Sequence, residues 1–280
     1  MASRTYEDLK PRLIVAGVLG TVSFGFLAWG GFVFAGLIAA GIFLMTQELL
    51  HIVRSDWDVP RTGAFVMGVL GASAALATGW NIWLILPAIV LAVAFGAFSA
   101  RQSPNTIAIV GFLLIVFAGV SVVLLRFQIG GFVLVLWLVL CVIAADVGGY
   151  FFGRQFGGPK FWPAVSPKKT WSGVLGGLLL TLIVALVFGV ASSGNLASFL
   201  VFGAIISVVS VAGDLLESAV KRKYGVKDAG SMLPGHGGLL DRFDGMTAVM
   251  VVFLVISQIT DLQSVLGVDY GPPPITTGGI

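Results

Sequence analysis

Long apolar stretches run along nearly the whole chain, and short polar or glycine-containing segments separate them. A helix that crosses a hydrocarbon core about 30 Å thick needs roughly 17–25 predominantly apolar residues. Nine stretches have that length, and we expect each to form a membrane-spanning helix: residues 12–28, 31–50, 63–79, 82–100, 105–125, 131–153, 172–192, 196–217 and 245–265. The pattern therefore predicts an all-α fold, a polytopic transmembrane helix bundle with about nine spans.

Two glycine-containing segments bear on how these helices are arranged. Only Trp29, Gly30 and Gly31 separate the first two stretches, which also permits one long helix with a kink. Gly173 and Gly177 are four residues apart, a spacing that lets two membrane helices approach closely. Because glycine is frequent in membrane helices anyway, the sequence leaves both the kink and the close packing open.

The composition agrees with a membrane protein. Of the 280 residues, 58% are hydrophobic and 10% are charged, whereas a soluble domain typically carries about 25% charged residues. The formal net charge of +3 does not indicate nucleic-acid binding, because the basic residues fall in short loops between apolar stretches. Cys141 is the only cysteine, which excludes an internal disulfide and a metal cluster built from cysteines.

The distribution of basic residues predicts the orientation. With nine spans and a cytoplasmic N-terminus, 15 of the 16 Lys and Arg residues lie inside and only Arg126 lies outside, as the positive-inside rule requires. We therefore expect a multi-pass protein of the cell inner (plasma) membrane, with a retained first span rather than a cleaved signal peptide. The C-terminus then lies outside, and residues 269–280, which include three successive prolines, are predicted to be a disordered tail.

Four acidic residues stand out, because ionisable groups within membrane spans are costly and usually functional. Asp146 lies in the sixth stretch and Asp214 closes the eighth, while Asp241 and Asp244 directly precede the ninth. The predicted topology brings all four to the cytoplasmic side, where their oxygens would suit a bound cation. In the alternative interpretation, Asp146 forms a hydrogen bond between helices and Asp214 reaches water at the membrane surface.

The segment from Asp214 to Asp244 is the most densely charged part of the chain. Asp214, Ser218 and Lys221 are spaced by four and three residues, so they share one face of a helix. An acid, a hydroxyl and an ammonium on one face suit a metal ion and a phosphate group. Arg222 lies about 100° round the same helix and is expected to meet a different phosphate.

A glycine-rich loop follows this helix. Gly237 and Gly238 let the backbone approach a ligand closely, and their N–H groups suit an anion. His236 in the same loop is either a turn residue or a functional group, and its position alone does not decide between the two.

A second basic cluster follows the sixth stretch. Lys168 and Lys169 are framed by Ser166 and Thr170, a set that suits a polyphosphate or an anionic headgroup. The alternative is an ordinary basic loop that meets anionic lipid without specificity. The chain contains neither a GxxxxGK[ST] motif nor a GxGxxG motif after a strand, which excludes the usual soluble nucleotide-binding folds.

The polar run as a whole closely resembles the signature of the phosphatidate cytidylyltransferases, also called CDP-diacylglycerol synthases. The matching positions are Ser218, Lys221, Arg222, Lys227, Asp228, Pro234, His236, Gly237, Gly238, Asp241, Arg242 and Asp244. Upstream pieces that look like the same family are Asp146 with Tyr150 and Gly153, then Ser166–Thr170, then Gly213 and Asp214. Ser172 departs from the pattern, since relatives often carry Glu or Gln there, which puts a role for that side chain in doubt.

The resemblance covers residues 140–250 strongly and divides the chain. Residues 1–130 match only as a hydrophobic bundle of about five spans, residues 131–268 form the expected catalytic region with its site at the cytoplasmic face, and residues 269–280 are the tail. The implied reaction converts CTP and phosphatidate to CDP-diacylglycerol and pyrophosphate. The implied partners are CTP, phosphatidate and membrane lipid, without nucleic acid, and the choice between a monomer and a homodimer stays open.

The resemblance also implies residue roles. Mg²⁺ would be held by Asp214, Asp241 and Asp244, with room for a second cation. The residues that would neutralise the phosphates are Lys221, Arg222, Lys227 and Arg242. Lys168 and Lys169 would hold CTP or its departing pyrophosphate. The implied catalytic residues are Asp146, Asp214, Ser218, Lys221, Arg222, Lys227, Asp228, His236, Asp241, Arg242 and Asp244, and the implied substrate-binding residues are Ser166, Lys168, Lys169, Thr170, Gly237 and Gly238. His236 would contact a phosphate or a metal-bound water rather than act as a base.

Two other functions compete with this one. A lipid-alcohol kinase or a CTP:isoprenoid-lipid cytidylyltransferase would need a similar basic cavity in the membrane. An ion or proton transporter would use Asp146 and Asp214 as a relay, but such proteins show repeated halves and sites at the midplane of the membrane. The sequence shows no such repeat, and its acidic residues gather at one surface.

Overall fold

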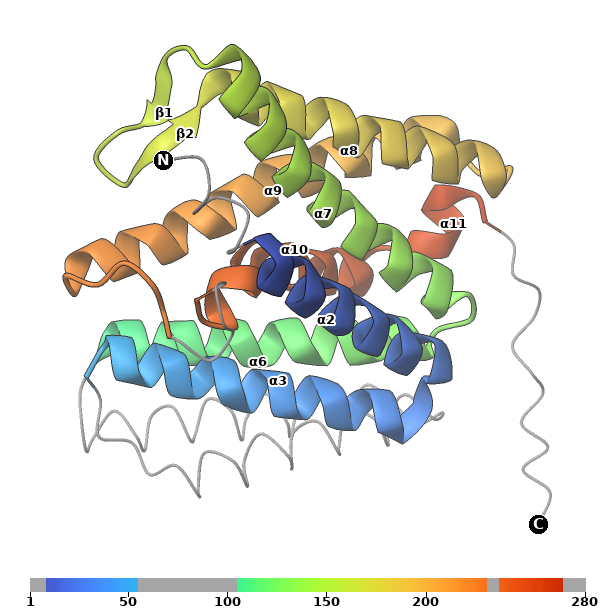
Figure 1. Cartoon of the computed structure of the whole chain (residues 1–280). Coiled ribbons are helices and arrows are strands. Elements are labelled where there is room, and N and C mark those ends of the chain that lie inside the picture. The colour runs from blue at the N-terminus through green and yellow to red at the C-terminus, as the bar shows by residue number, and fades with distance from the viewer. Residues whose placement is uncertain (1–8, 55–104, 231–236, 269–280) are drawn as a thin grey trace.

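The computed structural model describes residues 9–54, 105–230 and 237–268, and these residues are predominantly helical (Figure 1). The elements, in chain order, are α2 (Leu9–Trp29), α3 (Gly31–Ile52), α6 (Thr106–Phe127), α7 (Gly131–Phe156), β1 (Lys160–Trp162), β2 (Ser166–Thr170), α8 (Trp171–Ala191), α9 (Leu196–Lys223), α10 (Leu240–Ile259) and α11 (Leu262–Leu266).

The long helices coincide with the predicted spans. Six of them, α3, α6, α7, α8, α9 and α10, are long and apolar enough to cross a membrane. The first predicted span corresponds to α2, and the residues of it that the structure describes in full include a shorter apolar helix, Gly20–Trp29. The spans predicted at 63–79 and 82–100, and the tail 269–280, lie outside the described residues. The helical polytopic architecture is thus confirmed, while the count of nine spans and the sides of the termini stay predictions.

Local capping signals explain where several helices begin. The side-chain oxygens of Asn105, Thr170 and Asn195 accept hydrogen bonds from first-turn N–H groups of α6, α8 and α9. Such residues satisfy N–H groups that an isolated helix start leaves unpaired. The start of α10 differs, because its N-cap residue is Leu239, which offers no side-chain acceptor.

The first two spans are separate helices rather than one kinked helix. Gly30 and Gly31 have φ values of 72° and 58°, a left-handed region that favours glycine, and the chain turns back there (Figure 1). Arg126 at the end of α6 closes this turn, since its Nε donates to the carbonyl of Leu27 at 2.8 Å.

The close packing left open at Gly173 and Gly177 is present between α7 and α8. A Cβ atom on Gly173 would lie 2.7 Å from the carbonyl oxygen of Gly149, and one on Gly177 would lie 2.6 Å from that of Ala145. Both distances are too short for any residue larger than glycine. Backbone contact of this kind is typical of small residues at membrane-helix interfaces, and it fixes Asp146 on α7 relative to the start of α8.

A short antiparallel hairpin joins α7 to α8 and is a small addition to the predicted all-α fold. Strands β1 and β2 pair Lys160 with Thr170 and Trp162 with Ser166. Strands of three and five residues are too short to produce a clear alternating pattern. The hairpin places the second basic cluster, with Lys168 and Lys169, directly beside the helix bundle (Figure 1).

The apolar core has two parts. One cluster consists of α7, α9, α10 and their neighbours, with Trp137 and Phe253 fully buried. The other joins α3 and α6 to Ala229, Leu239 and Leu240, which flank the start of α10. The division at residue 130 stays a prediction, but this second cluster packs N-terminal helices directly against the glycine-rich loop of the C-terminal region.

Candidate active site

The last turns of α9 carry the polar face that the sequence predicted. Ser218 Oγ donates to Asp214 Oδ1 at 3.3 Å, which confirms that the two side chains lie together. Lys221 Nζ lies 2.7 Å from Glu217 Oε2, one helical turn earlier. The sequence analysis missed Glu217, although its spacing of four from Lys221 is the usual spacing of a helical ion pair.

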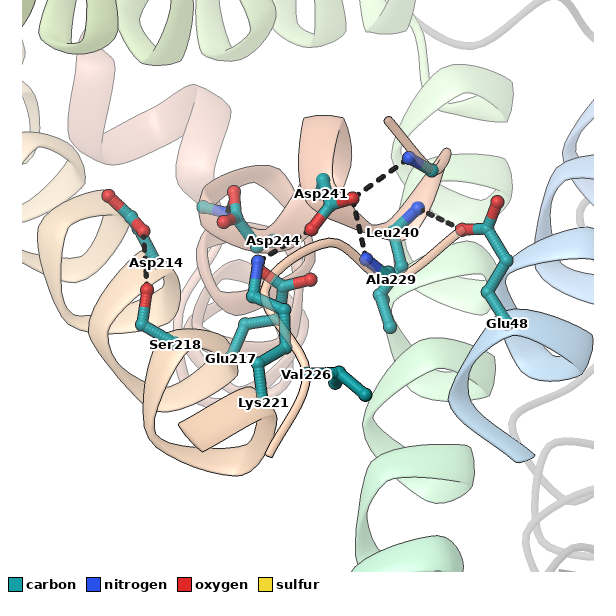
Figure 2. Close-up of polar contacts among 12 residues, drawn as sticks. Glu48, Asp214, Glu217, Ser218, Lys221, Val226, Ala229, Leu240, Asp241 and Asp244 are labelled. Atoms are coloured by element: carbon teal, nitrogen blue, oxygen red, sulfur yellow. Dashed lines mark hydrogen bonds and ion pairs between the residues drawn. The ribbon is translucent and has the colours of Figure 1, made fainter. Parts of the chain in front are cut away.

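Lys221 joins α9 to α10. Its Nζ lies 2.5 Å from Asp241 Oδ1 as well as against Glu217 (Figure 2). The Lys221 side chain is 11% exposed and both carboxylate side chains are 9% exposed. Buried charges require such pairing. The ammonium that was expected to neutralise substrate phosphates therefore bridges two carboxylates in this structure.

Asp241 also organises the glycine-rich loop. Its Oδ2 accepts hydrogen bonds from the backbone N–H groups of Ala229 and Gly238, each at 2.8 Å (Figure 2). Gly237 has a φ of 81°, and a Cβ atom there would lie 2.8 Å from the same oxygen. Gly237 and Gly238 do let the backbone approach closely, and the group that they approach here is the carboxylate of Asp241.

A second ion pair links the hairpin to α9. Lys169 Nζ lies 2.6 Å from Asp214 Oδ2 and donates to the carbonyl of Val211 at 3.4 Å. Lys169 is thus brought to the predicted carboxylates, whereas Lys168 on the same strand is exposed to solvent. A phosphate-binding ammonium and a cation-binding carboxylate would therefore be direct neighbours.

Thr170 and Ser172 hold this hairpin in place. Thr170 Oγ1 accepts from Gly173 N at 3.2 Å and lies 3.0 Å from Ser172 Oγ. Ser172 Oγ also donates to the carbonyl of Gly157 at the end of α7. Ser172 thus closes the hairpin through short polar contacts, which gives a structural role to the position where this chain departs from its relatives.

Two of the four predicted carboxylates lie within electrostatic range of a third, Asp214, while Asp241 pairs with Lys221. Asp146 lies within electrostatic range of Asp214, Lys169 and Arg242. Asp244 lies within range of Asp214 and directly against Glu217. The Oε1 atom of Glu217 is buried and has no hydrogen-bond donor. Like-charged oxygens gathered in this way favour a cation between them.

The side chains of the protein supply only part of a coordination shell for a metal ion. Among the described residues, no three acidic, His or Cys side chains lie close enough together to hold one ion. Mg²⁺ usually takes only one or two carboxylates and completes its shell with substrate phosphates and water. Asp244 lies within electrostatic range of Asp214 and Glu217, so these carboxylates are the candidates for such a partial set of ligands.

The remaining predicted residues differ in exposure, and one of them cannot be placed. Arg222 is exposed and donates from Nη1 to the carbonyl of Val226 at 3.3 Å, so it closes the end of α9. Lys227 and Asp228 are exposed in the loop after α9, and Ser166 is half-buried on β2. His236 lies outside the described residues, so its predicted role stays a prediction.

The sequence analysis also missed Glu48 on α3. This side chain is only 7% exposed, and it accepts hydrogen bonds from the N–H groups of Leu239 and Leu240. Its position as an acidic residue inside an apolar stretch could have indicated a functional role from the sequence. The sequence could not predict its hydrogen-bond partners, because they lie in the opposite half of the chain.

Comparisons with known proteins agree with these features. The sequence model of the cytidylyltransferase family matches residues 10–260. The phosphatidate cytidylyltransferase of Brucella suis is 34% identical over 275 residues, which cover 90% of this chain and 94% of that protein. That of Haemophilus influenzae is 43% identical over 129 residues, which cover 44% of this chain and 45% of that protein. That of Staphylococcus saprophyticus is 44% identical over 124 residues, 44% of this chain and 48% of that protein.

Proposed function

The chain belongs to the cytidylyltransferase family, and from this premise we propose that it is a phosphatidate cytidylyltransferase. It transfers the cytidylyl group of CTP to phosphatidate and so produces CDP-diacylglycerol and pyrophosphate. The observation that carries this conclusion is the 34% identity, over 90% of the chain, to a protein named for this activity. The convergence of carboxylates and lysines from α7, the hairpin, α9 and α10 supports it.

The reaction forms a bond between a phosphatidate oxygen and the α-phosphorus of CTP. The bond from this phosphorus to the oxygen that bridges to the β-phosphate breaks, and pyrophosphate leaves with that oxygen. Phosphatidate is ionised at neutral pH, so no side chain has to remove a proton from it. The main barrier is electrostatic, because two polyanions must approach in line, and catalysis then depends on positioning and charge stabilisation.

The basic groups of the site meet that electrostatic need. Lys169, held at the edge of α9 by Asp214, presents an ammonium to the phosphates of CTP. Arg242 at the start of α10 lies within electrostatic range of Asp146. Lys168 is exposed on the hairpin and is placed to meet the nucleotide as it enters from water.

The carboxylates would hold the metal. Asp214 and Asp244 are the proposed ligands, with the unpartnered Oε1 of Glu217 beside Asp244; Asp214 would exchange its contacts with Lys169 and Ser218 for the metal. Asp241, the third predicted ligand, already accepts from Lys221 and two N–H groups. Mg²⁺ held by these carboxylates would supply positive charge for the phosphates and for the departing pyrophosphate.

We place the site at the cytoplasmic face of the inner membrane. The distribution of lysine and arginine in the sequence supports this orientation. In the structure, the end of α7, the hairpin, the end of α9 and the start of α10 lie toward one end of the bundle (Figure 1). A site at that level meets CTP from the cytosol and phosphatidate from the leaflet.

The test is an assay of the purified protein in mixed micelles. We expect it to convert CTP and phosphatidate to CDP-diacylglycerol with release of pyrophosphate. Turnover with a polyprenyl phosphate in place of phosphatidate would instead identify an isoprenoid-lipid enzyme. Cation flux in liposomes without CTP, together with no transferase activity, would identify a transporter and overturn the proposal.

A further inference from the structure

Glu48 is a buried carboxylate that the proposed chemistry does not use. It lies on α3 among the apolar side chains that pack α3 against α6, and it is only 7% exposed. A buried carboxylate without partners is strongly unfavourable in such surroundings. The partners that make its burial possible therefore indicate what it does.

These partners are the first N–H groups of α10. Leu239 N donates to Glu48 Oε1 at 2.9 Å. Leu240 N donates to Oε2 at 2.7 Å (Figure 2). α10 has no N-cap side chain of its own, because Leu239 occupies that position. Glu48 supplies the missing cap from 191 positions earlier in the chain. Its negative charge is also favourable at the positive end of the helix dipole.

Two carboxylates accept the hydrogen bonds from the N–H groups at and near the start of α10. Asp241 accepts from Gly238 and Ala229, while Glu48 accepts from the next two residues, Leu239 and Leu240. Asp241 and Asp244 lie within the first turns of this helix. Their direction is therefore set partly by a side chain that reaches in from α3.

Gly230 and Gly238 lie close against the Glu48 carboxylate. A Cβ atom on Gly230 would lie 2.8 Å from Oε1, and one on Gly238 would lie 2.6 Å from Oε2. Although a glutamate end can usually move aside, this one is held by two hydrogen bonds that any movement would weaken. The two glycines and Glu48 thus form one fitted arrangement.

We propose that Glu48 is a positioning residue of the active site, which caps α10 from α3 and thereby aims Asp241 and Asp244. This role rests on the proposed function, because it assigns those two carboxylates to cytidylyl transfer. Helix α3, in the N-terminal half of the chain, then contributes to the reaction through the position of α10. Small misplacements of catalytic groups can cost about a hundredfold in rate, so the cap matters for turnover more than for substrate affinity.

Glu48→Gln tests the role with little change in side-chain volume. The amide nitrogen would face an N–H group where an acceptor is needed, so we expect kcat to fall about tenfold or more while KM for CTP changes less than threefold. The matched control is Thr46→Val on the same helix, because Thr46 is fully buried and its Oγ1 has no hydrogen-bond partner. Unchanged kcat in Glu48→Gln, or an equal loss in Thr46→Val, would overturn the proposal.

Hydrogen exchange separates this proposal from the proposed function. In Glu48→Gln, the backbone amides of Leu239 and Leu240 should exchange faster than in the wild type, while those in the middle of α6 keep their protection. This measurement needs no substrate. If the wild type failed to make CDP-diacylglycerol, the function would be wrong and the exchange would still test the cap. Unchanged exchange at both amides would show that Glu48 does not cap α10.

A double-mutant cycle with Gly230→Ala tests the fitted arrangement. The added methyl group displaces the Glu48 carboxyl, so Gly230→Ala alone should lower kcat. In a Glu48→Ala background the methyl group has room, and the same change should cost several-fold less. Equal losses in both backgrounds would contradict a direct coupling between the two positions.

Discussion

The ammonium of Lys221 lies 2.5 Å from the carboxylate of Asp241 and ties the end of α9 to the start of α10. Glu217 shares the same ammonium, so one buried cation stands between two buried anions. This arrangement gives Lys221 an internal partner on each helix. Its expected contribution is therefore to the geometry of the carboxylates as much as to the phosphates of the substrates.

Lys221→Met should destabilise the protein and stop turnover. Removing one partner of a buried ion pair leaves uncompensated charge and typically costs about 3–5 kcal/mol. Denaturant titration in micelles would measure the free energy of unfolding, and the control is Lys223→Ala, an exposed residue on the same turn, with an expected change within about 0.5 kcal/mol. Adding Glu217→Gln to Lys221→Met should restore part of the stability. Wild-type stability of Lys221→Met would contradict the bridge.

Asp244→Asn should separate activity from stability. The change removes one of several like charges beside Glu217 and Asp214, so the thermal midpoint should stay the same or rise. Loss of the proposed metal ligand should lower kcat at least about a hundredfold. The control is Asp261→Asn at the cap of α11, since asparagine caps equally well there. Substantial turnover by Asp244→Asn would remove this residue from the metal site.

Removal of divalent cations should abolish turnover without unfolding the protein. The carboxylates of α9 and α10 are already tied by Lys221 and Lys169, so the helices do not need the metal to stay together. We expect EDTA to eliminate CDP-diacylglycerol formation, excess Mg²⁺ to restore it, and the circular dichroism spectrum to stay constant. Undiminished turnover in EDTA would exclude a metal-dependent reaction.

Cysteine labelling should establish the orientation of the bundle. Lys223→Cys lies at the end of α9 beside the site, and Ala197→Cys lies in the first turn of the same helix, and both positions are exposed. An impermeant thiol reagent applied to intact spheroplasts should modify Ala197→Cys, and Lys223→Cys only after lysis. The native Cys141 is buried and provides the unlabelled background. The reverse pattern would place the site on the outer face.

The sequence by itself determined the helical membrane architecture, since span length and apolar composition are local properties of each stretch. It also predicted a common level for Asp146, Asp214, Asp241 and Asp244 from their places at the ends of spans, and in the structure Asp146 and Asp244 both lie within electrostatic range of Asp214. The motif between Ser218 and Asp244 was sufficient to indicate the reaction. Predicting these features requires little knowledge of how the helices pack.

Only the tertiary structure decided which charges pair and which helices meet. Lys221 turns to two carboxylates rather than outward, because burial makes an unpaired ammonium costly. Glu48 caps α10 because α3 packs against Ala229, Leu239 and Leu240, and no local sequence pattern predicts this contact. Side-chain partners so far apart in the chain depend on the packing of whole helices, and that packing arises only when the complete bundle forms.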